Sequence, residues 1–252
     1  MSQPPPETLQ RVQAELLLPD EIDTALAARS VVYLPLGSIE YHSHHLPIGL
    51  DGLNAHGVCT HAAARSGGIV LPTLYYGVGG GHTTYPWTIM ATSSAPLVDL
   101  LETALRRLDD LGVRVAVLFT GHFAEEQLAL IDDLADRWNA GTAGLKALAL
   151  AVNRSNAPIA PDHAGIFETT LLSALWPDLV HLDRLPSLGD VPDPDPADAV
   201  GYEHRHDPTH PLWGVMGPDP RHLDTETAED LLGSLTAWVI REVGRYATIL
   251  AG

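Results

Sequence analysis

Three short stretches of the chain concentrate histidine and carboxylate side chains. Residues 37–51 read Gly-Ser-Ile-Glu-Tyr-His-Ser-His-His-Leu-Pro-Ile-Gly-Leu-Asp. Residues 120–126 read Thr-Gly-His-Phe-Ala-Glu-Glu, and residues 162–170 read Asp-His-Ala-Gly-Ile-Phe-Glu-Thr-Thr. Imidazole and carboxylate groups suit Zn²⁺, Mn²⁺ or Fe²⁺, and the single cysteine, Cys59, excludes a thiolate cluster. The stretches therefore indicate a site for divalent metal ions.

The spacing within these stretches supports convergence of the side chains. Glu40 and His42 are two residues apart, so an extended backbone directs both to one side. His122 and Glu125 are three residues apart, so the start of a helix would place both on one face. The spacing does not match a general zinc signature such as His-Glu-x-x-His. On this basis a metal site and a set of hydrogen-bonding loop histidines both remain open.

Charge balance adds a second argument for cations. Convergence of Glu40, Asp51 and Glu168 would gather three negative charges, which is costly in a protein interior without compensation. Two divalent cations would supply four positive charges, and one hydroxide would make the total zero. The balance depends on all three carboxylates reaching one place.

The elements that must position these residues follow from apolar patterning. Strand-like runs cover 30–36, 69–74, 113–119 and 148–152, and helix-like segments cover 20–29, 53–65, 97–111, 125–139, 167–176 and 225–246. This alternation predicts an α/β fold with a mostly parallel central sheet and helices on both faces. The first two histidine-rich stretches directly follow predicted strands. We expect them to meet at the carboxyl edge of the sheet, where ligand sites form.

The chain length of 252 residues is enough for one large α/β domain. We expect a single domain over 1–252, with a disordered leader at 1–12. We also expect a long excursion near the site at 183–222, which is rich in Pro, Asp and His. The excursion contributes further candidates for substrate specificity, namely Tyr202, His204, His206, His210 and Trp213.

Composition limits the partners of the protein. A formal net charge of −18 argues against binding to nucleic acid or to anionic lipid. The longest apolar runs have the length of strands, which predicts no membrane span, and the first residues do not resemble a signal peptide. A single cysteine suits a reducing compartment, so we expect a cytoplasmic protein.

Four stretches resemble motifs of the creatininase family. Residues 37–51 are similar to Gly-Ser-x-Glu-x-His-Gly-x-His-Leu-Pro-x-x-x-Asp. Residues 120–125 resemble Asn-Gly-His-Gly-Gly-Asn, and residues 163–170 resemble His-Ala-Gly-x-x-Glu-Thr-Ser. Residues 214–225 loosely resemble Gly-x-x-Gly-x-Pro followed by Ala-Thr. The resemblance extends over residues 20–245, which is nearly the whole chain.

The resemblance implies a three-layer α/β sandwich, one or two divalent metals per chain, and hydrolysis of a C–N bond in a small-molecule substrate. It also implies a homo-oligomer, since many members form hexamers. Asp51 would be a bridging carboxylate and His163 a proton donor. Carried over by position, the metal ligands are Glu40, His42, Asp51, His122 and Glu168.

Departures from the family pattern fall in places expected near the substrate. Ser43-His44 replaces the usual Gly-Pro, and Trp87 stands where Gly is common. Creatininase has a ligand Glu two residues after the histidine of the second motif. This chain has Ala124 at that place, and Glu125 follows one position later. We therefore expect His44, Trp87 and Glu125 to contact the substrate, and we expect a substrate other than creatinine. Whether Glu125 is a ligand stays open.

The predicted function is metal-dependent hydrolysis of an amide, cyclic amide or formamide bond. One alternative keeps the metals and opens a keto-cyclitol ring at a C–C bond, or a lactone. Another is a non-catalytic metal-binding protein, for which the altered second motif is the support.

Overall fold

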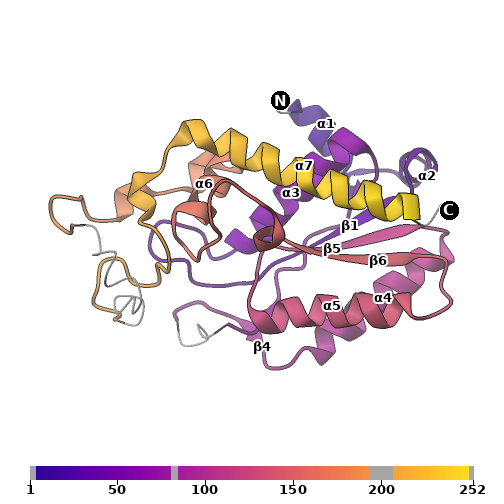
Figure 1. Ribbon diagram of the computed structural model, residues 1–252, viewed down its shortest axis with the longest axis horizontal. Coiled ribbons are helices and arrows are strands. Elements are labelled where there is room, and N and C mark those ends of the chain that lie inside the picture. Colours follow the sequence, from indigo (N-terminus) through magenta and orange to yellow (C-terminus); the bar gives the residue numbers. More distant parts are fainter. Residues whose placement is uncertain (1–3, 81–84, 193–206, 250–252) are drawn as a thin grey trace.

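A four-stranded parallel sheet forms the centre of the molecule (Figure 1). The computed structural model describes residues 4–80, 85–192 and 207–249. The strands are β1 (Val31–Leu36), β2 (Ile69–Val70), β5 (Val115–Thr120) and β6 (Lys146–Ala151), in the order β2-β1-β5-β6. A separate parallel pair is formed by β3 (Gly77–Val78) and β4 (Met90–Ala91).

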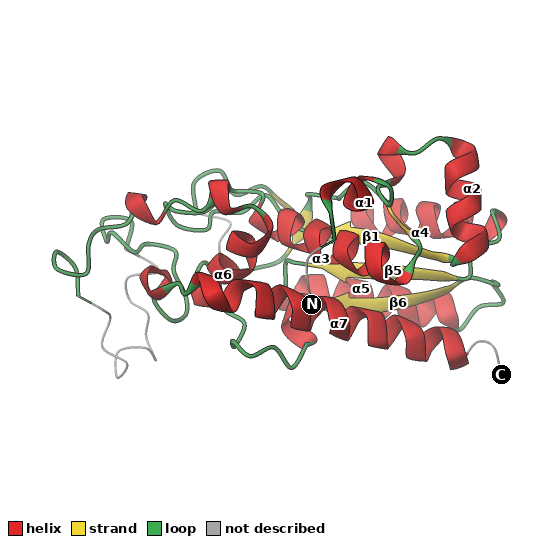
Figure 2. Ribbon diagram, turned by 90° about the horizontal axis from the view of Figure 1, so that it is seen from above, coloured by secondary structure: helices red, strands yellow, loops and turns green. Residues whose placement is uncertain are grey.

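Helices cover both faces of this sheet, which gives three layers (Figures 1 and 2). One face carries α3 (Leu50–Ser66), α6 (Ile166–Leu175) and α7 (Thr225–Ile249). The other face carries α4 (Ala95–Asp110) and α5 (Glu125–Asn139), and α2 (Pro19–Ala28) packs against the same core. Short 3-10 helices occupy Ala14–Leu16, Val152–Arg154, Pro177–Leu179, Leu182–Arg184 and Pro220–His222. The predicted α/β sandwich is confirmed.

The core is divided by the alternation of side chains along the strands. Tyr33 and Phe119 point into the cluster formed with α3, α6 and α7. Leu34 and Leu118 point into the cluster formed with α4 and α5. Every residue of β1 and of β5 is buried, as expected for central strands of a parallel sheet covered on both faces.

The N-terminal segment and the second predicted strand are among the segments that differ from the sequence predictions. Within the predicted leader, α1 (Pro6–Gln10) begins with proline at its first position, where the missing N–H costs nothing. The backbone N–H of Val70 donates to the carbonyl of Val12 at 2.7 Å, which ties this segment to the edge of the sheet. The strand predicted over 69–74 is limited to β2, and beyond Pro72 the pairing with β1 resumes only as an isolated bridge between Leu36 and Leu74. Among the described helices, none is both long and apolar enough to cross a membrane.

Candidate metal centre

The ends of β1 and β5 bring the first two histidine-rich stretches together. Leu36 and Thr120, the last residues of these strands, are register partners. The N–H of Gly121 donates to the carbonyl of Leu36 at 2.9 Å, so the two chains leave the sheet side by side. Glu40 and His42 follow β1, and His122 follows β5, at the carboxyl edge where ligand sites form.

Two helices supply the remaining carboxylates from their first turns. Asp51 is the second residue of α3, which begins at Leu50 rather than at the predicted Leu53. Glu168 is the third residue of α6. Both carboxylates therefore lie near positively polarised helix ends, which favour negative charge.

The five predicted ligands form two groups that share one residue. Glu40, Asp51 and His122 make up the first group, and each offers an atom within 4.8 Å of the others. His42, Asp51 and Glu168 make up the second group by the same criterion. All five side chains are buried, with exposed fractions between 1% and 5%.

Each carboxylate oxygen of Asp51 faces a different histidine. Oδ1 lies 3.3 Å from Nε2 of His42, which is also 3.5 Å from Oε2 of Glu168. Oδ2 lies 3.3 Å from Nδ1 of His122, which is also 3.0 Å from Oε2 of Glu40. The carboxylate of Asp51 therefore joins the two groups, with one oxygen toward each histidine.

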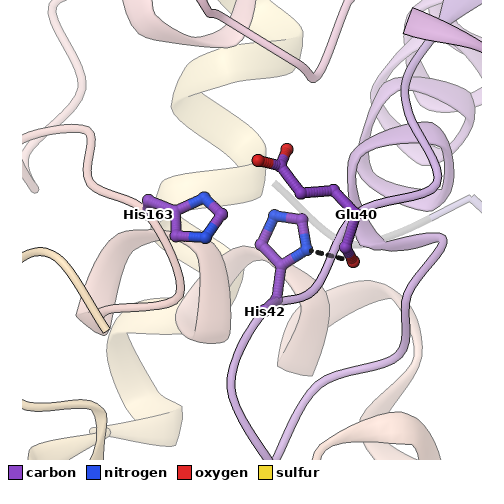
Figure 3. Close-up of side chains that lie close together, drawn as sticks. All are labelled: Glu40, His42 and His163. Carbon is purple, nitrogen blue, oxygen red and sulfur yellow. Dashed lines mark hydrogen bonds between the residues drawn. The ribbon is translucent and has the colours of Figure 1, made fainter. Parts of the chain in front are cut away.

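The geometry of His42 fits a metal ligand. Its Nδ1 lies 3.0 Å from the carbonyl oxygen of Glu40, which can only accept, so Nδ1 carries the hydrogen (Figure 3). In the neutral ring Nε2 then presents a lone pair, and this buried atom makes no hydrogen bond although two carboxylates are near. Ligands on a tetrahedral ion with bonds of 2.0–2.2 Å are about 3.4 Å apart, similar to the separations around His42.

The pKa values of these groups are shifted by burial and by the charges of their neighbours. Burial would raise the pKa of Asp51, but His42 and His122 hold that pKa well below its ordinary value. Burial would lower the pKa of His42, but Asp51 and Glu168 raise it to about 10. Burial raises the pKa of Glu168 well above its ordinary value, and the neighbouring charge of Asp51 adds to the rise. The protein alone holds protons where divalent cations would replace them, as expected for a metal site.

Asp162 anchors the loop and helix that carry His163 and Glu168. Its Oδ2 accepts from the N–H of Phe167 at 3.0 Å, and its Oδ1 accepts from Gly165 at 3.2 Å and from Glu168 at 3.4 Å. Burial outweighs these donors and raises the pKa of Asp162 to about 6. The contacts satisfy N–H groups at the start of α6 that would otherwise lack partners.

His163 lies beside His42 and forms a third group with Glu40 and His42, in which each side chain offers an atom within 4.8 Å of the others. The two ring centroids are 4.4 Å apart (Figure 3). Nε2 of His163 lies 3.2 Å from the carbonyl oxygen of Tyr41, an acceptor, so Nε2 carries a hydrogen. Its backbone pairs with Met216, which links the third motif to the fourth.

A cavity of about 200 Å³ opens onto these groups. Phe123, Ala124 and Met216 supply apolar wall, and Gly80 supplies backbone. Glu40, Asp51, His122, His163 and Glu168 line the same cavity. The arrangement is a small pocket with a charged floor and apolar walls, suited to a small polar molecule.

The three predicted substrate contacts lie outside this cavity as the described residues define it. Glu125 is exposed and does not line the cavity. Because α5 begins at Glu125 and His122 precedes the helix, these two side chains do not share a helical face. Ala124 occupies the place beside the site instead. His44 is exposed, and its ring nitrogens lie 3.3 Å from the hydroxyl of Tyr41.

Trp87, the third predicted substrate contact, lies at the surface. It is 77% exposed and adopts a left-handed backbone conformation with φ of 60°. Trp213 of the excursion packs instead on Tyr41 and Tyr85, with ring centroids 5.0 and 5.2 Å away. Tyr202, His204 and His206 fall outside the described residues.

Several contributors to the site carry a weak sequence signal. Ser38 touches two of the carboxylates, yet a serine outside a nucleophile motif does not suggest such a role. Phe123 and Met216 are ordinary apolar residues, and only the fold places them at the cavity. Asp162 is the first residue of the third histidine- and carboxylate-rich stretch, and that position is the signal that the sequence offers for it.

Comparison with known proteins gives a consistent assignment. A family model described as "Creatininase: Creatinine amidohydrolase" matches residues 15–243. The chain is 34% identical over 182 residues to creatinine amidohydrolase of Pseudomonas putida, covering 63% of this chain and 69% of that protein. It is 27% identical over 161 residues to the mycofactocin precursor peptide peptidase of Mycolicibacterium smegmatis, and the match spans 62% of each.

Solved structures extend the similarity over the whole fold. The crystal structure of creatinine amidohydrolase (creatininase) matches with a TM-score of 0.74 at 28% identity, covering 93% of this chain and 97% of that one. A structure described as "Creatininase Mn" matches with a TM-score of 0.74 at 27% identity, covering 93% and 98%. A mutant creatininase of "Zn-Zn type" matches with a TM-score of 0.71 at 26% identity, also covering 93% and 98%. This chain therefore belongs to the creatininase family and is a metal-dependent amidohydrolase.

Proposed function

We propose that this enzyme hydrolyses the C–N bond of a small polar amide, cyclic amide or formamide at two divalent cations that share Asp51. The observation that carries the proposal is the pair of ligand groups, one on each oxygen of Asp51, at the floor of a 200 Å³ cavity. Because the cavity is small, it would admit a small substrate or only the reacting part of a larger one. The apolar side chains of Phe123 and Met216 line this cavity, and they favour a substrate that has an apolar edge as well as a polar group.

Glu40, Asp51 and His122 would hold one cation, and His42, Asp51 and Glu168 would hold the other. Oxygen and nitrogen ligands suit Zn²⁺ and Mn²⁺, the ions in the descriptions of two similar structures. When bound, such cations acidify a water molecule and polarise a carbonyl oxygen. The remaining steps depend on the side chains of this protein.

His163 is the proposed proton carrier. Because Nε2 keeps its hydrogen on the carbonyl of Tyr41, Nδ1 is the atom that can take up a proton from the attacking water and release it. Figure 3 shows a ring nitrogen of His163 on the side of the Glu40 carboxylate. Protonated at Nδ1, the ring would donate to the leaving nitrogen, so that the amine departs neutral.

The test is a product assay on a panel of cyclic amides, formamides and short peptides with metal-loaded protein. We expect release of an amine together with a carboxylate. If acid appears from lactones or keto-cyclitols and no amine appears from any amide, the ring-opening alternative replaces this proposal. Glu40→Gln protein provides the matched control, because the change removes the charge of one ligand and keeps its size.

We also propose that the protein forms a homo-oligomer through three exposed apolar side chains, Ile48, Trp87 and Ile89. Their exposed fractions are 41%, 77% and 52%. Both isoleucines flank one chain segment, since Ile89 donates to Ile39 and Ile48 accepts from Glu40, each at 2.8 Å. Light scattering after size exclusion should give a multiple of 27.0 kDa, reduced by Trp87→Ser with Ile89→Ser.

A further inference from the structure

Ser38 is the second residue after β1 and has no exposed surface. Its hydroxyl donates to Oδ2 of Asp51 at 2.5 Å and lies 3.3 Å from Oε2 of Glu40. A β-carbon on Gly77 would lie 3.1 Å from Cβ of Ser38, so the backbone of β3 packs tightly against this serine. The hydroxyl is therefore held on the two carboxylates by close packing.

Both oxygens that Ser38 contacts belong to the same half of the site. Oε2 of Glu40 and Oδ2 of Asp51 are the two atoms that face Nδ1 of His122. The other half has a different support, since Oε2 of Glu168 accepts from the N–H of Ala164 at 2.7 Å. The two halves thus differ in their hydrogen bonds although their ligand types match.

Orientation of the shared carboxylate decides how many cations the site can hold. An aspartate that bridges must give one oxygen to each ion, whereas rotation of its carboxylate would let both oxygens bind one ion. A hydrogen bond to Oδ2 opposes that rotation, and it leaves Oδ1 directed at His42. Hydrogen-bond partners of ligands commonly set metal affinity in this way.

We propose that Ser38 is a positioning residue that holds Asp51 in its bridging orientation and sets the affinity of the half formed by Glu40 and His122. The inference rests on the proposed two-cation site. It assigns to Ser38 a role in loading the second cation rather than in the chemistry of the substrate.

The experiment is a titration of chelator-treated protein with Mn²⁺, in which electron paramagnetic resonance counts the free ion. Wild type should bind two ions. Ser38→Ala should weaken one of them about 10- to 100-fold and leave the other within about threefold of wild type. Ser43→Ala is the matched control, because Ser43 is buried in the same loop and its Oγ makes no hydrogen bond.

Two further variants keep the result interpretable. Ser38→Cys replaces the hydroxyl with a larger and much weaker donor, so it should also weaken one ion, and Mn²⁺ has little preference for thiolate. In a His42→Ala background, where the Glu40 and His122 half remains, Ser38→Ala should lower the affinity for the single ion by the same factor. This variant identifies the half on which Ser38 acts.

The outcomes separate the two proposals. Two ions bound with unchanged affinities in Ser38→Ala and Ser38→Cys would overturn the role of Ser38 and leave the two-cation site standing. Equal weakening of both ions would also overturn it. A wild-type protein that binds no Mn²⁺ and no Zn²⁺ would instead remove the proposed function itself.

Discussion

The backbone carbonyl of Asp51 lies against Gly121, with no room for a β-carbon between them. A β-carbon on Gly121 would come within 2.0 Å of that oxygen. Gly37, at the end of β1, is equally close to α3, since its β-carbon would lie 2.2 Å from the nitrogen of Gly52. The first turn of α3 therefore rests directly on the ends of two central strands, and this contact fixes the depth of Asp51 in the site.

Gly121→Ala should displace the start of α3. The nearest atoms are backbone, which cannot move aside cheaply, so we expect a loss of about 1–3 kcal/mol in the free energy of unfolding. Urea denaturation measures the loss, and metal content should fall with it. Gly233→Ala in α7 is the control, because nothing lies within 4 Å of its β-carbon position. That change should stabilise the helix by about 0.5–1 kcal/mol.

Asp51→Ala should remove both cations, because the shared carboxylate serves each group. Plasma mass spectrometry of protein purified with excess metal should fall from about two ions per chain to fewer than one. Glu125→Ala should retain both ions, since Glu125 is exposed and lies outside the ligand groups of the described residues. Metal loss in Glu125→Ala would show that this carboxylate reaches the site after all.

His163→Asn should keep the metal and slow the reaction. Loss of a proton carrier is typically worth about 10²–10⁴ in rate, so kcat should fall by that factor with little change in metal affinity. Turnover and metal content are measured on the same preparation. Unchanged turnover would refute the role of His163, and lost metal would make it a ligand.

The pH dependence of stability should differ between metal-free and metal-loaded protein. Asp51 and Glu168 raise the pKa of His42 to about 10, above its value near 6.5 in the unfolded chain. Folding therefore favours the protonated ring, and this contribution is complete below about pH 6.5 and is lost as the pH rises toward 10. With Mn²⁺ bound, the cation replaces that proton, so the contribution should vanish from the profile.

Thermal melting with chelator and with Mn²⁺, measured from pH 6.5 to 10, tests this difference. The melting temperature of the chelated protein should fall over the range, and that of the loaded protein should fall less. Parallel curves would contradict the assigned interaction among His42, Asp51 and Glu168.

Sequence patterns were sufficient for the strands and helices that form the sheet sandwich. Periodicity located α5 at Glu125–Asn139, and it located the last residues before the site on β1 and β5. The convergence of Glu40 and Asp51 with His122 followed from a general property of parallel sheets. Charge and ligand chemistry then connected them to cations.

Positions of single side chains around the pocket could not be predicted in the same way. Whether Ala124 or Glu125 faces the cavity depends on where the first turn of α5 begins, and a shift of one residue rotates a side chain by about 100°. Met216 reaches the pocket through a bridge to His163, a contact 53 positions away in sequence that no local pattern reveals. The fold of residues 6–10 was missed because proline-rich composition is typical of both disorder and helix starts.

The distribution of sulfur has a consequence for oxidative damage. Cys59 is fully buried in α3, and burial raises the pKa of its thiol well above the ordinary value. The thiol therefore stays protonated, and the thiolate form that peroxide oxidises is not populated. The proposed ligands contain oxygen and nitrogen only. Among the described residues that line the cavity, Met216 alone carries sulfur. Conversion of this thioether to a sulfoxide would make an apolar wall polar, and methionine sulfoxide reductase would restore it.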